Sequence, residues 1–377
     1  MVRSTLPFGI GRSGSSSGGG GGAGTYSIGS GGTYADLNAA LAAALLTPSD
    51  INSSGLQQRD IHFQITAAGM TVSNSFQNLE GWNPNGFKLY IEPAPGAAWQ
   101  SGYSIANPLN PATQYGASLI LNGTSTIWVG TGTTMAVVFR NLQIFNTGKF
   151  GNGSNYGPIV GIGNVLSGST FEFDNNLFYW DGNSHYAPAI GWGWYPSGQD
   201  TSIEANVTFI TRNNIIYGLE AVDNIGMLIY ATGGGPGGGP LSNHYNNLIL
   251  KQGTTGGLGL QVSNGLSNIK NNSFCNYYYA SSPDDITISY DTYGSYPNVS
   301  NNATSGPSFN DSRLTTNQLL NATAALCFNS PTITSTDLRL TSGSPLKGAG
   351  VLDAVNNPTD ILGRTRSSPD CIGPWAS

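Results

Sequence analysis

Hydrophobic and polar residues alternate with a period of two through most of the chain after residue 60. In the segment DIHFQIT, Ile61, Phe63 and Ile65 alternate with His62 and Gln64. The segments FKLYIEP, SLILNG and TIWVG repeat this pattern. Successive side chains of a strand point to opposite faces, so the alternation predicts short β-strands. The segments between them are long and rich in Gly, Asn and Pro, which predicts loops.

One stretch near the N-terminus has helical spacing instead. Thr33 and Asp36 match the Ser/Thr-x-x-Asp/Glu signal that begins many helices. The leucines at positions 37, 41 and 45 fall on one helical face, and Pro48 follows the last of them. This pattern predicts a helix over residues 33–48.

An asparagine precedes a short apolar run five times, in RNLQIF, DNNLFYW, RNNIIYG, YNNLIL and KNNSFC, at intervals of 35, 38, 33 and 25 residues. Intervals of this size, with one strand-turn-strand element per unit, predict a solenoid of stacked coils with loops of variable length. Asparagine tolerates left-handed turn geometry, and its amide can hydrogen-bond to a neighbouring coil about 4.8 Å away. The predicted structural ladder consists of Asn141, Asn176, Asn214, Asn247 and Asn272.

The scarcity of charge agrees with stacked coils. The chain has 377 residues, of which 14 Lys+Arg and 20 Asp+Glu make up 9%, against roughly a quarter in ordinary globular chains. Like charges stacked about 5 Å apart repel by roughly 1 kcal/mol in water and by more near a protein surface. Stacked faces therefore favour neutral polar residues. The 18 Tyr, 14 Phe and 7 Trp exclude a disordered chain and predict an apolar core.

Composition also argues against several classes of partner and cofactor. The net charge of −6 includes no basic run, so we expect no nucleic acid partner. Three cysteines imply no disulfide framework. GGGPGGGP lacks the Lys-Ser/Thr of a phosphate-binding loop, and SSPDDITISYD lacks the Gly and Glu of a calcium-binding EF-hand loop, so no cofactor and no metal are predicted.

The N-terminus has no apolar signal sequence, and no stretch is long enough to span a bilayer, which predicts synthesis in a cytoplasm and no membrane association.

The helical segment and the C-terminal residues together resemble the right-handed parallel β-helix superfamily of pectate-lyase-like proteins, which includes phage tailspikes. GGTYADLNAALAAA resembles the helix that caps the first coil in phage and bacterial members. The C-terminal residues similar to the closing segment of bacterial members are Leu338, Leu340, Ser344, Pro345, Gly348, Ala349, Gly350, Asp360, Gly363, Arg364, Pro369, Asp370, Ile372, Gly373 and Trp375. Cys371, Pro374 and Ala376 depart from that pattern. The resemblance covers roughly residues 30–376 and implies an all-β, single-stranded right-handed parallel β-helix.

The chain divides into four parts on these grounds. Residues 1–32 form a Gly/Ser-rich anchoring arm, and residues 33–48 form a capping helix. Residues 49–330 form the parallel β-helix with long loops, and residues 331–377 form the C-terminal closing segment. The arm begins with an apolar head, in which Leu6, Phe8 and Ile10 are candidate anchors to another virion protein, although a flexible tail is the simpler interpretation of such a composition.

The most acid-rich part of the chain is the best place to look for catalysis. The candidates are Glu172, Asp181 and Glu204, because hydrolases of this superfamily use two or three carboxylates in a groove. Asp174 and Arg212 occupy matched positions two residues before the asparagines at 176 and 214. We interpret them as an ion pair between coils and favour that structural explanation over catalysis.

A long loop carries candidate sugar-binding aromatic residues, namely Trp180, Trp192, Trp194 and Tyr195. Exposed aromatic rings with nearby hydrogen-bond donors suit sugar stacking. Packing of these rings against the scaffold or a neighbouring subunit is the favoured alternative.

The leading hypothesis is a bacteriophage virion protein. It would be a β-helical tail spike, tail fibre or capsid decoration, held by its N-terminal arm, forming a homotrimer and presenting loops to the host surface or its polysaccharide. The absent signal sequence, the apolar and glycine-rich arm, the capping helix and the neutral surface motivate it. A polysaccharide lyase or glycoside hydrolase is the alternative from another class, and a bacterial surface adhesin is a third.

Overall fold

The computed structural model describes much of the chain, and every structural statement below concerns these residues. They are 24–44, 50–72, 83–121, 127–129, 134–146, 160–162, 166–180, 189–192, 207–218, 225–230, 241–251, 258–263, 266–275, 278–279, 282–283, 286–289, 298–309, 317–332 and 335–376.

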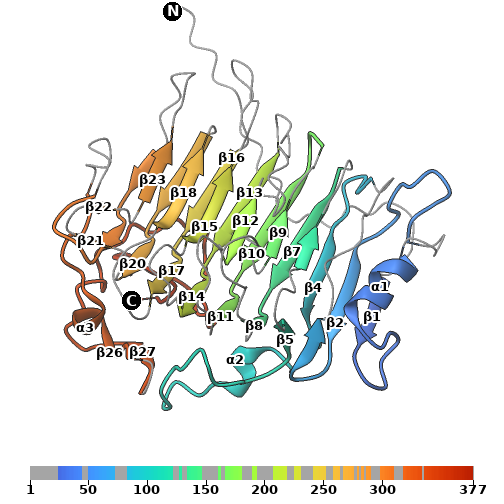
Figure 1. Ribbon diagram of the computed structural model, residues 1–377, viewed down its shortest axis with the longest axis horizontal. Coiled ribbons are helices and arrows are strands. Elements are labelled where there is room, and N and C mark those ends of the chain that lie inside the picture. Colours follow the sequence, from blue (N-terminus) through green and yellow to red (C-terminus); the bar gives the residue numbers. More distant parts are fainter. Residues whose placement is uncertain are drawn as a thin grey trace, which may run out of the picture.

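Most of the described strands belong to three parallel sheets that run side by side along the molecule (Figure 1). The nine-stranded sheet contains β1 (Gly24–Ile28), β2 (Ile61–Ile65), β4 (Leu89–Pro93), β7 (Ala136–Arg140), β10 (Thr170–Asp174), β13 (Thr208–Arg212), β16 (Leu241–Tyr245), β19 (Leu266–Lys270) and β24 (Asn298–Ser300). The eight-stranded sheet contains β3 (Met70–Val72), β5 (Ser118–Leu121), β8 (Gln143–Asn146), β11 (Leu177–Trp180), β14 (Ile215–Gly218), β17 (Leu248–Lys251), β20 (Ser273–Cys275) and β25 (Ala303–Thr304). The six-stranded sheet contains β6 (Ile127–Val129), β9 (Val160–Ile162), β12 (Ile190–Trp192), β15 (Ile225–Tyr230), β18 (Leu258–Ser263) and β23 (Ile286–Ser289).

The order of the strands gives the topology. The chain passes from β7 to β8 to β9, one strand in each sheet, and then returns as β10 beside β7. The next pass repeats the sequence with β11 beside β8 and β12 beside β9. The described chain is therefore mostly β, as predicted, and its parallel sheets have the connectivity of a solenoid in which each coil stacks on the last.

The remaining elements lie at the ends and sides of this stack. The helices are α1 (Leu37–Ala44), α2 (Trp99–Gly102) and α3 (Ala324–Cys327). Two small antiparallel pairs join β21 (Tyr278–Tyr279) to β22 (Ser282–Pro283), and β26 (Phe328–Ser330) to β27 (Asp337–Leu340).

The helix near the N-terminus begins later than the sequence predicts. The backbone N–H of Ala39 donates to Asp36 Oδ1 at 2.8 Å, so Asp36 provides the N-terminal cap of α1. Thr33 instead exchanges hydrogen bonds with Ser27. Residues 45–48 of the predicted helix lie outside the described residues.

The first strand also lies inside the segment assigned to the arm. β1 pairs in parallel with β2 from Gly24↔Ile61 to Ile28↔Ile65. The stack therefore begins before residue 33, because Tyr26 and Ile28 continue the apolar alternation of β2. The candidate anchors Leu6, Phe8 and Ile10 lie outside the described residues.

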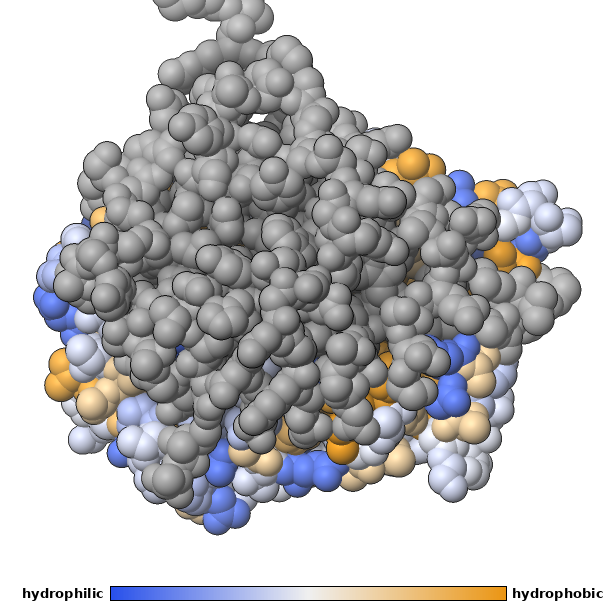
Figure 2. Space-filling model, in the orientation of Figure 1, coloured by the Kyte–Doolittle hydropathy of each residue, from blue (hydrophilic) through white to orange (hydrophobic). Residues whose placement is uncertain are grey.

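Apolar side chains from successive coils fill the interior. Phe63, Ile91, Phe139 and Phe173 hold matching positions in neighbouring strands, and all four are fully buried. The rings of Phe139 and Phe173 are parallel, with centroids 5.0 Å apart, which is close to the spacing of the coils. Each coil alone would expose this face, so stacking supplies the hydrophobic stabilisation. On the face shown in Figure 2, the visible described residues alternate between hydrophilic and hydrophobic in small groups.

Candidate functional site

The repeated asparagines form a buried hydrogen-bonded column between the nine- and eight-stranded sheets. The Oδ1 of Asn214 accepts both the backbone N–H and the side-chain amide of Asn176, each at 3.0 Å. Asn247 accepts the same two bonds from Asn214, at 3.0 and 2.9 Å. The pattern repeats up the stack through Asn272 to Asn302. All five side chains are fully buried, so this column has a structural role and offers nothing to a ligand.

Each of these asparagines also bonds back to an earlier coil. The second amide hydrogen of Asn214 is donated to the carbonyl oxygen of Phe173 at 2.9 Å, and that of Asn272 to the carbonyl of His244 at 2.9 Å. The column ends at the backbone N–H of Leu142 on one side and at Gln318 Oε1 on the other. The buried amides are thereby satisfied, which makes them specific connections between coils.

A second column of asparagines lies one residue earlier in each coil. Its members have left-handed backbone geometry, with φ between 53° and 57°: Asn141, Asn175, Asn213, Asn246, Asn271 and Asn301. Asparagine tolerates this region better than most other residues, because its side chain can hydrogen-bond locally. The repeated Asn-Asn pair thus has two roles, a left-handed turn followed by an inward amide.

Asn141 therefore belongs to the outer column, whereas the sequence pattern predicted it in one ladder with Asn176, Asn214, Asn247 and Asn272. Its coil has Leu142 at the inward position, which supplies only a backbone donor to Asn176. The pair Asn301-Asn302 was not among the predicted repeats, although its segment SNNATS has the same Asn-Asn pattern with smaller residues after it.

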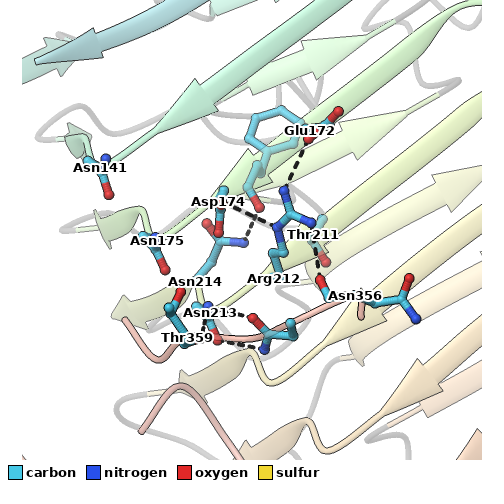
Figure 3. A network of polar contacts seen from close by, with 12 residues as sticks. Asn141, Glu172, Asp174, Asn175, Thr211, Arg212, Asn213, Asn214, Asn356 and Thr359 are labelled. Atoms are coloured by element: carbon cyan, nitrogen blue, oxygen red, sulfur yellow. Dashed lines mark hydrogen bonds and ion pairs between the residues drawn. The ribbon is translucent and has the colours of Figure 1, made fainter. Parts of the chain in front are cut away.

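The C-terminal segment packs along the outer asparagine column. The amide of Asn213 donates to Asn357 Oδ1 and to the carbonyl of Thr359, at 2.8 and 2.9 Å. The amides of Asn246 and Asn271 donate to main-chain carbonyls of residues 371, 373 and 351. Figure 3 shows Asn141, Asn175 and Asn213 in sequence, with Thr359 beside Asn213. The segment 350–375 is thus a strap that binds alongside the coils.

A buried ion pair fixes this strap. Arg366 Nη1 bonds to both oxygens of Asp370, at 2.9 and 3.0 Å, and its Nη2 donates to Asn213 Oδ1 at 2.8 Å. Arg366 also donates to the carbonyl of Trp375 at 2.8 Å. Burial lowers the pKa of Arg366 and raises that of Asp370, while each charge opposes the effect on the other. The geometry is that of a structural lock, because both charges are enclosed and satisfied.

Glu172, the one catalytic candidate among the described residues, is held by two cations. Its side chain forms a short ion pair with Lys88, and Arg212 Nη2 lies 3.2 Å from Glu172 Oε2. Glu172 is 8% exposed. Asp181 and Glu204 lie outside the described residues, so no second carboxylate candidate is placed beside it.

The predicted ion pair between Asp174 and Arg212 is present, with Arg212 Nε 3.3 Å from Asp174 Oδ2. Strand register places Arg140, Asp174 and Arg212 in one column, so charges of opposite sign alternate from coil to coil. Figure 3 shows Arg212 between Glu172 and Asp174, with a further bond to Asn356 of the strap. The few charges of this face therefore neutralise one another instead of forming a reactive site.

A similar network lies two strands earlier in the nine-stranded sheet. Glu92 accepts a bond from His62 Nδ1 at 2.8 Å and forms a short ion pair with Arg140. Burial acts to raise the pKa of Glu92, but the bonds from His62 and Arg140 outweigh it and lower the pKa below its ordinary value. The guanidinium of Arg140 also lies 4.5 Å from the centre of the Tyr90 ring.

The aromatic candidates are placed only in part. Trp180 is 1% exposed and belongs to the hydrophobic core, so its predicted role in sugar binding is wrong. Its alternating position in β11 directs it inward with Phe178. The backbone of Trp192 forms the end of β12, while Trp194 and Tyr195 lie outside the described residues.

The sequence analysis missed a cleft between the α2 loop and the C-terminal segment. It has a volume of about 370 Å³ and is lined by Tyr103, Ile105, Leu109, Asn329, Arg339, Leu340, Lys347, Ile361, Leu362, Arg364, Trp375 and Ala376. No carboxylate is among these lining residues. The sequence gave only a weak signal for this cleft, because Arg339, Lys347 and Arg364 form no recognised motif and the loop of residues 103–109 that completes the cleft lies more than 200 residues before them.

The comparisons with known proteins give no further assignment: no family model, no curated protein and no solved structure matches this chain. No described helix is long and apolar enough to span a membrane. In the described part of the chain there is no group of three or more His, Cys, Asp or Glu side chains that could hold a metal ion. The three cysteines are buried free thiols.

Proposed function

We propose that this chain is a structural, non-enzymatic β-helical appendage of a bacteriophage virion, anchored by its N-terminal arm. The assignment of a structural role rests on the pairing of the Glu172 carboxylate with two cations. The carboxylate is neutralised by Lys88 and Arg212, and Asp174 of the same strand shares Arg212 with it. A general acid or nucleophile needs an accessible carboxylate opposite a second one, and this pair serves to join coils.

The finer architecture belongs to the same proposal. Parallel strands joined by a crossover in one sheet are right-handed in almost all proteins, which favours a right-handed β-helix. α1 lies beside β1 at one end of the stack (Figure 1), where Leu37 and Ala40 are buried against the core. We assign it the role of a cap, because the first coil would otherwise expose its apolar side.

The virion assignment is supported by the N-terminal arm and by the resemblance of the chain to phage tailspikes. A short apolar segment followed by Gly/Ser-rich sequence can dock into another protein while the β-helix projects from it. A rigid body with hydrogen-bonded coils suits exposure to the environment, since its stability is spread over every interface between coils.

Removal of the arm tests this function. We expect a chain that lacks residues 1–23 to fold with unchanged circular dichroism but to be absent from purified particles, because β1 and all later strands are retained. Mass spectrometry of particles that carry full-length or shortened chains measures incorporation. Equal incorporation of the shortened chain would contradict an anchoring arm.

An assay for polysaccharide cleavage distinguishes an enzyme from a purely structural protein. Release of sugars or unsaturated products from a capsular polysaccharide, lost in Asp181→Asn or Glu204→Gln, would contradict the non-enzymatic assignment. Glu172→Gln serves as the comparison. We expect this substitution to lower the stability of the fold, because it weakens the ion pairs with Lys88 and Arg212, and to leave sugar release unchanged.

A further inference from the structure

The cleft beside the C-terminal strap has an uneven balance of charge. Arg339 is neutralised by Asp337, which it contacts through Nε at 2.9 Å and through Nη2 at 2.6 Å. Arg364 is neutralised by Asp360, with Nε 2.7 Å from Oδ2. Lys347 is different: its ammonium donates to the carbonyl of Ser342 at 3.4 Å and has no ion pair with any described carboxylate. Among the described residues that line the cleft, Lys347 is therefore the one cation without a carboxylate partner.

The paired carboxylates do not cancel this charge. Burial acts to raise the pKa of Asp337, but hydrogen bonds from Arg339 lower it to about 2, so the Asp337–Arg339 pair stays ionised and neutral overall at physiological pH. Neither Asp337 nor Asp360 lines the cleft, so its polar lining consists mainly of donors. A donor-rich cleft with one net positive charge selects a ligand with one negative charge and several acceptors.

The rest of the lining suits a ligand with an apolar face. Ile105 is 58% exposed, and Leu340 is half-buried at the same cleft. Trp375 and Tyr103 form part of the wall, and burial raises the pKa of Tyr103 to about 12, so its hydroxyl stays a neutral hydrogen-bonding group. A sugar ring combines a C–H face with hydroxyl groups, which matches such a wall.

A second hollow of about 490 Å³ uses the same two chain segments. Its lining includes Asn107, Asn110, Thr113, Tyr115, Ser335 and Thr336, which are neutral groups able to bond to hydroxyls. Asp337 lines this hollow and bonds to Arg339 of the first cleft. Neighbouring neutral units of a polymer would find partners there.

We propose that the cleft at Lys347 binds a carboxylate-bearing sugar, with the carboxylate at the Lys347 ammonium and the ring against Ile105. This inference deepens the proposed function, on which its biological role rests, because it identifies the surface and the ligand class through which the appendage would contact a polysaccharide. The binding itself is a property of the folded chain in solution.

Saturation-transfer NMR titrations of the full chain test the proposal with two matched probes. Glucuronate and glucose share the same ring and differ in having a carboxylate or a hydroxymethyl group. We expect saturable binding of glucuronate and binding of glucose at least tenfold weaker, since one charge-assisted hydrogen bond accounts for about that factor. Equal binding of the two sugars would overturn the assignment.

Variants locate the site. Lys347→Met is expected to weaken glucuronate binding about tenfold, while its melting temperature stays unchanged because the residue is exposed. Lys270→Met, a substitution of the same type in β19 outside the cleft, is the control and is expected to bind normally. Unchanged binding in Lys347→Met would overturn the proposal.

Isothermal titration calorimetry with inorganic phosphate and with glucuronate, on the unaltered chain and on Ile105→Ser, separates a sugar site from a simple anion site. The serine variant should lose affinity for glucuronate but not for phosphate, and phosphate should bind the unaltered chain more weakly than glucuronate. Tighter phosphate binding would overturn the sugar assignment. If the chain is found in particles but binds no glucuronate, this inference fails alone; if it binds glucuronate but is absent from particles, the virion assignment fails alone.

Discussion

At the scale of the residue, the Asn-Asn pair explains both the repeat and its tolerance of variable loops. The first asparagine adopts the left-handed turn, and the second places its amide in the buried column. The bonds of one inner asparagine reach both the next coil and an earlier one. Loop length elsewhere in the coil can change without disturbing this point.

Substitution of one inner asparagine should therefore be costly. Asn214→Leu removes the acceptor of two bonds from Asn176 and leaves a buried backbone N–H without a partner. We expect a loss of about 2–4 kcal/mol in the free energy of unfolding, measured with urea. Asn298→Leu, at an exposed position, is the matched control and should change stability by less than about 0.5 kcal/mol. A similar small change in both variants would contradict the role of the column.

A buried histidine makes stability depend on pH. His244 lies in the core, where its Nδ1 contacts Thr211 Oγ1 at 2.8 Å, and burial lowers its pKa from 6.5 to about 3. The unfolded chain then takes up a proton below pH 6.5 that the folded chain takes up only near pH 3, so this contribution to stability is lost as pH falls between these values.

The expected size of this effect is about 2–3 kcal/mol between pH 7 and pH 4.5. Thermal unfolding followed over this range should show a flatter pH dependence in His244→Leu than in the unaltered chain. Parallel curves for the two proteins would show that His244 does not titrate in this way.

At the scale of the element, sequence pattern and structure agree where one strand's own residues decide the outcome. The alternation of Ile61, Phe63 and Ile65 gave β2, and the left-handed preference of asparagine gave the turns. The beginning of α1 was misplaced because Thr33 and Asp36 both fit a cap, and the contact of Thr33 with Ser27 decides between them. That contact depends on the turn after β1, which the local pattern does not specify.

The candidate sites were harder to predict, because they depend on contacts between distant segments. Trp180 is of a residue type that often stacks on sugars, but its inward position in β11 makes it a core residue. The cleft at Lys347 joins residues 103–109 to residues 329–376. The strap along the outer asparagines likewise joins segments more than 100 residues apart, such as Asn213 and Asn357.

The strap should detach when its lock is removed. Arg366 is 4% exposed, and Arg366→Met leaves Asp370 buried without its partner, which costs about 3–5 kcal/mol. We expect faster hydrogen exchange across residues 350–375, while the strands of the nine-stranded sheet stay protected. Val355→Ala, at a side chain 71% exposed, is the control. Uniform acceleration over all coils would show instead that the strap and the stack unfold as one unit.

At the scale of the whole molecule, the described residues form a stack of coils with paired charges on one long sheet. Arg140, Asp174 and Arg212 show how a charge-poor surface is kept stable by alternation of sign between coils. A body with paired charges can project from a particle without producing a strong electrostatic field around it. The proposed arm and the proposed homotrimer remain predictions about how it is attached.

The oligomeric state can be measured directly in solution. Light scattering of the purified chain should give three times the 39.3 kDa mass of one chain. The result should not depend on concentration over a tenfold range if the trimer is permanent. A mass of 39.3 kDa throughout would contradict the trimer.

Cryo-electron microscopy of particles from the source of this chain tests whether the chain is a structural part of a virion. We expect density that fits the three parallel sheets, with residues 1–23 bound to a capsid or tail protein. Particles that lack the chain, or that hold it with the arm unattached, would contradict it.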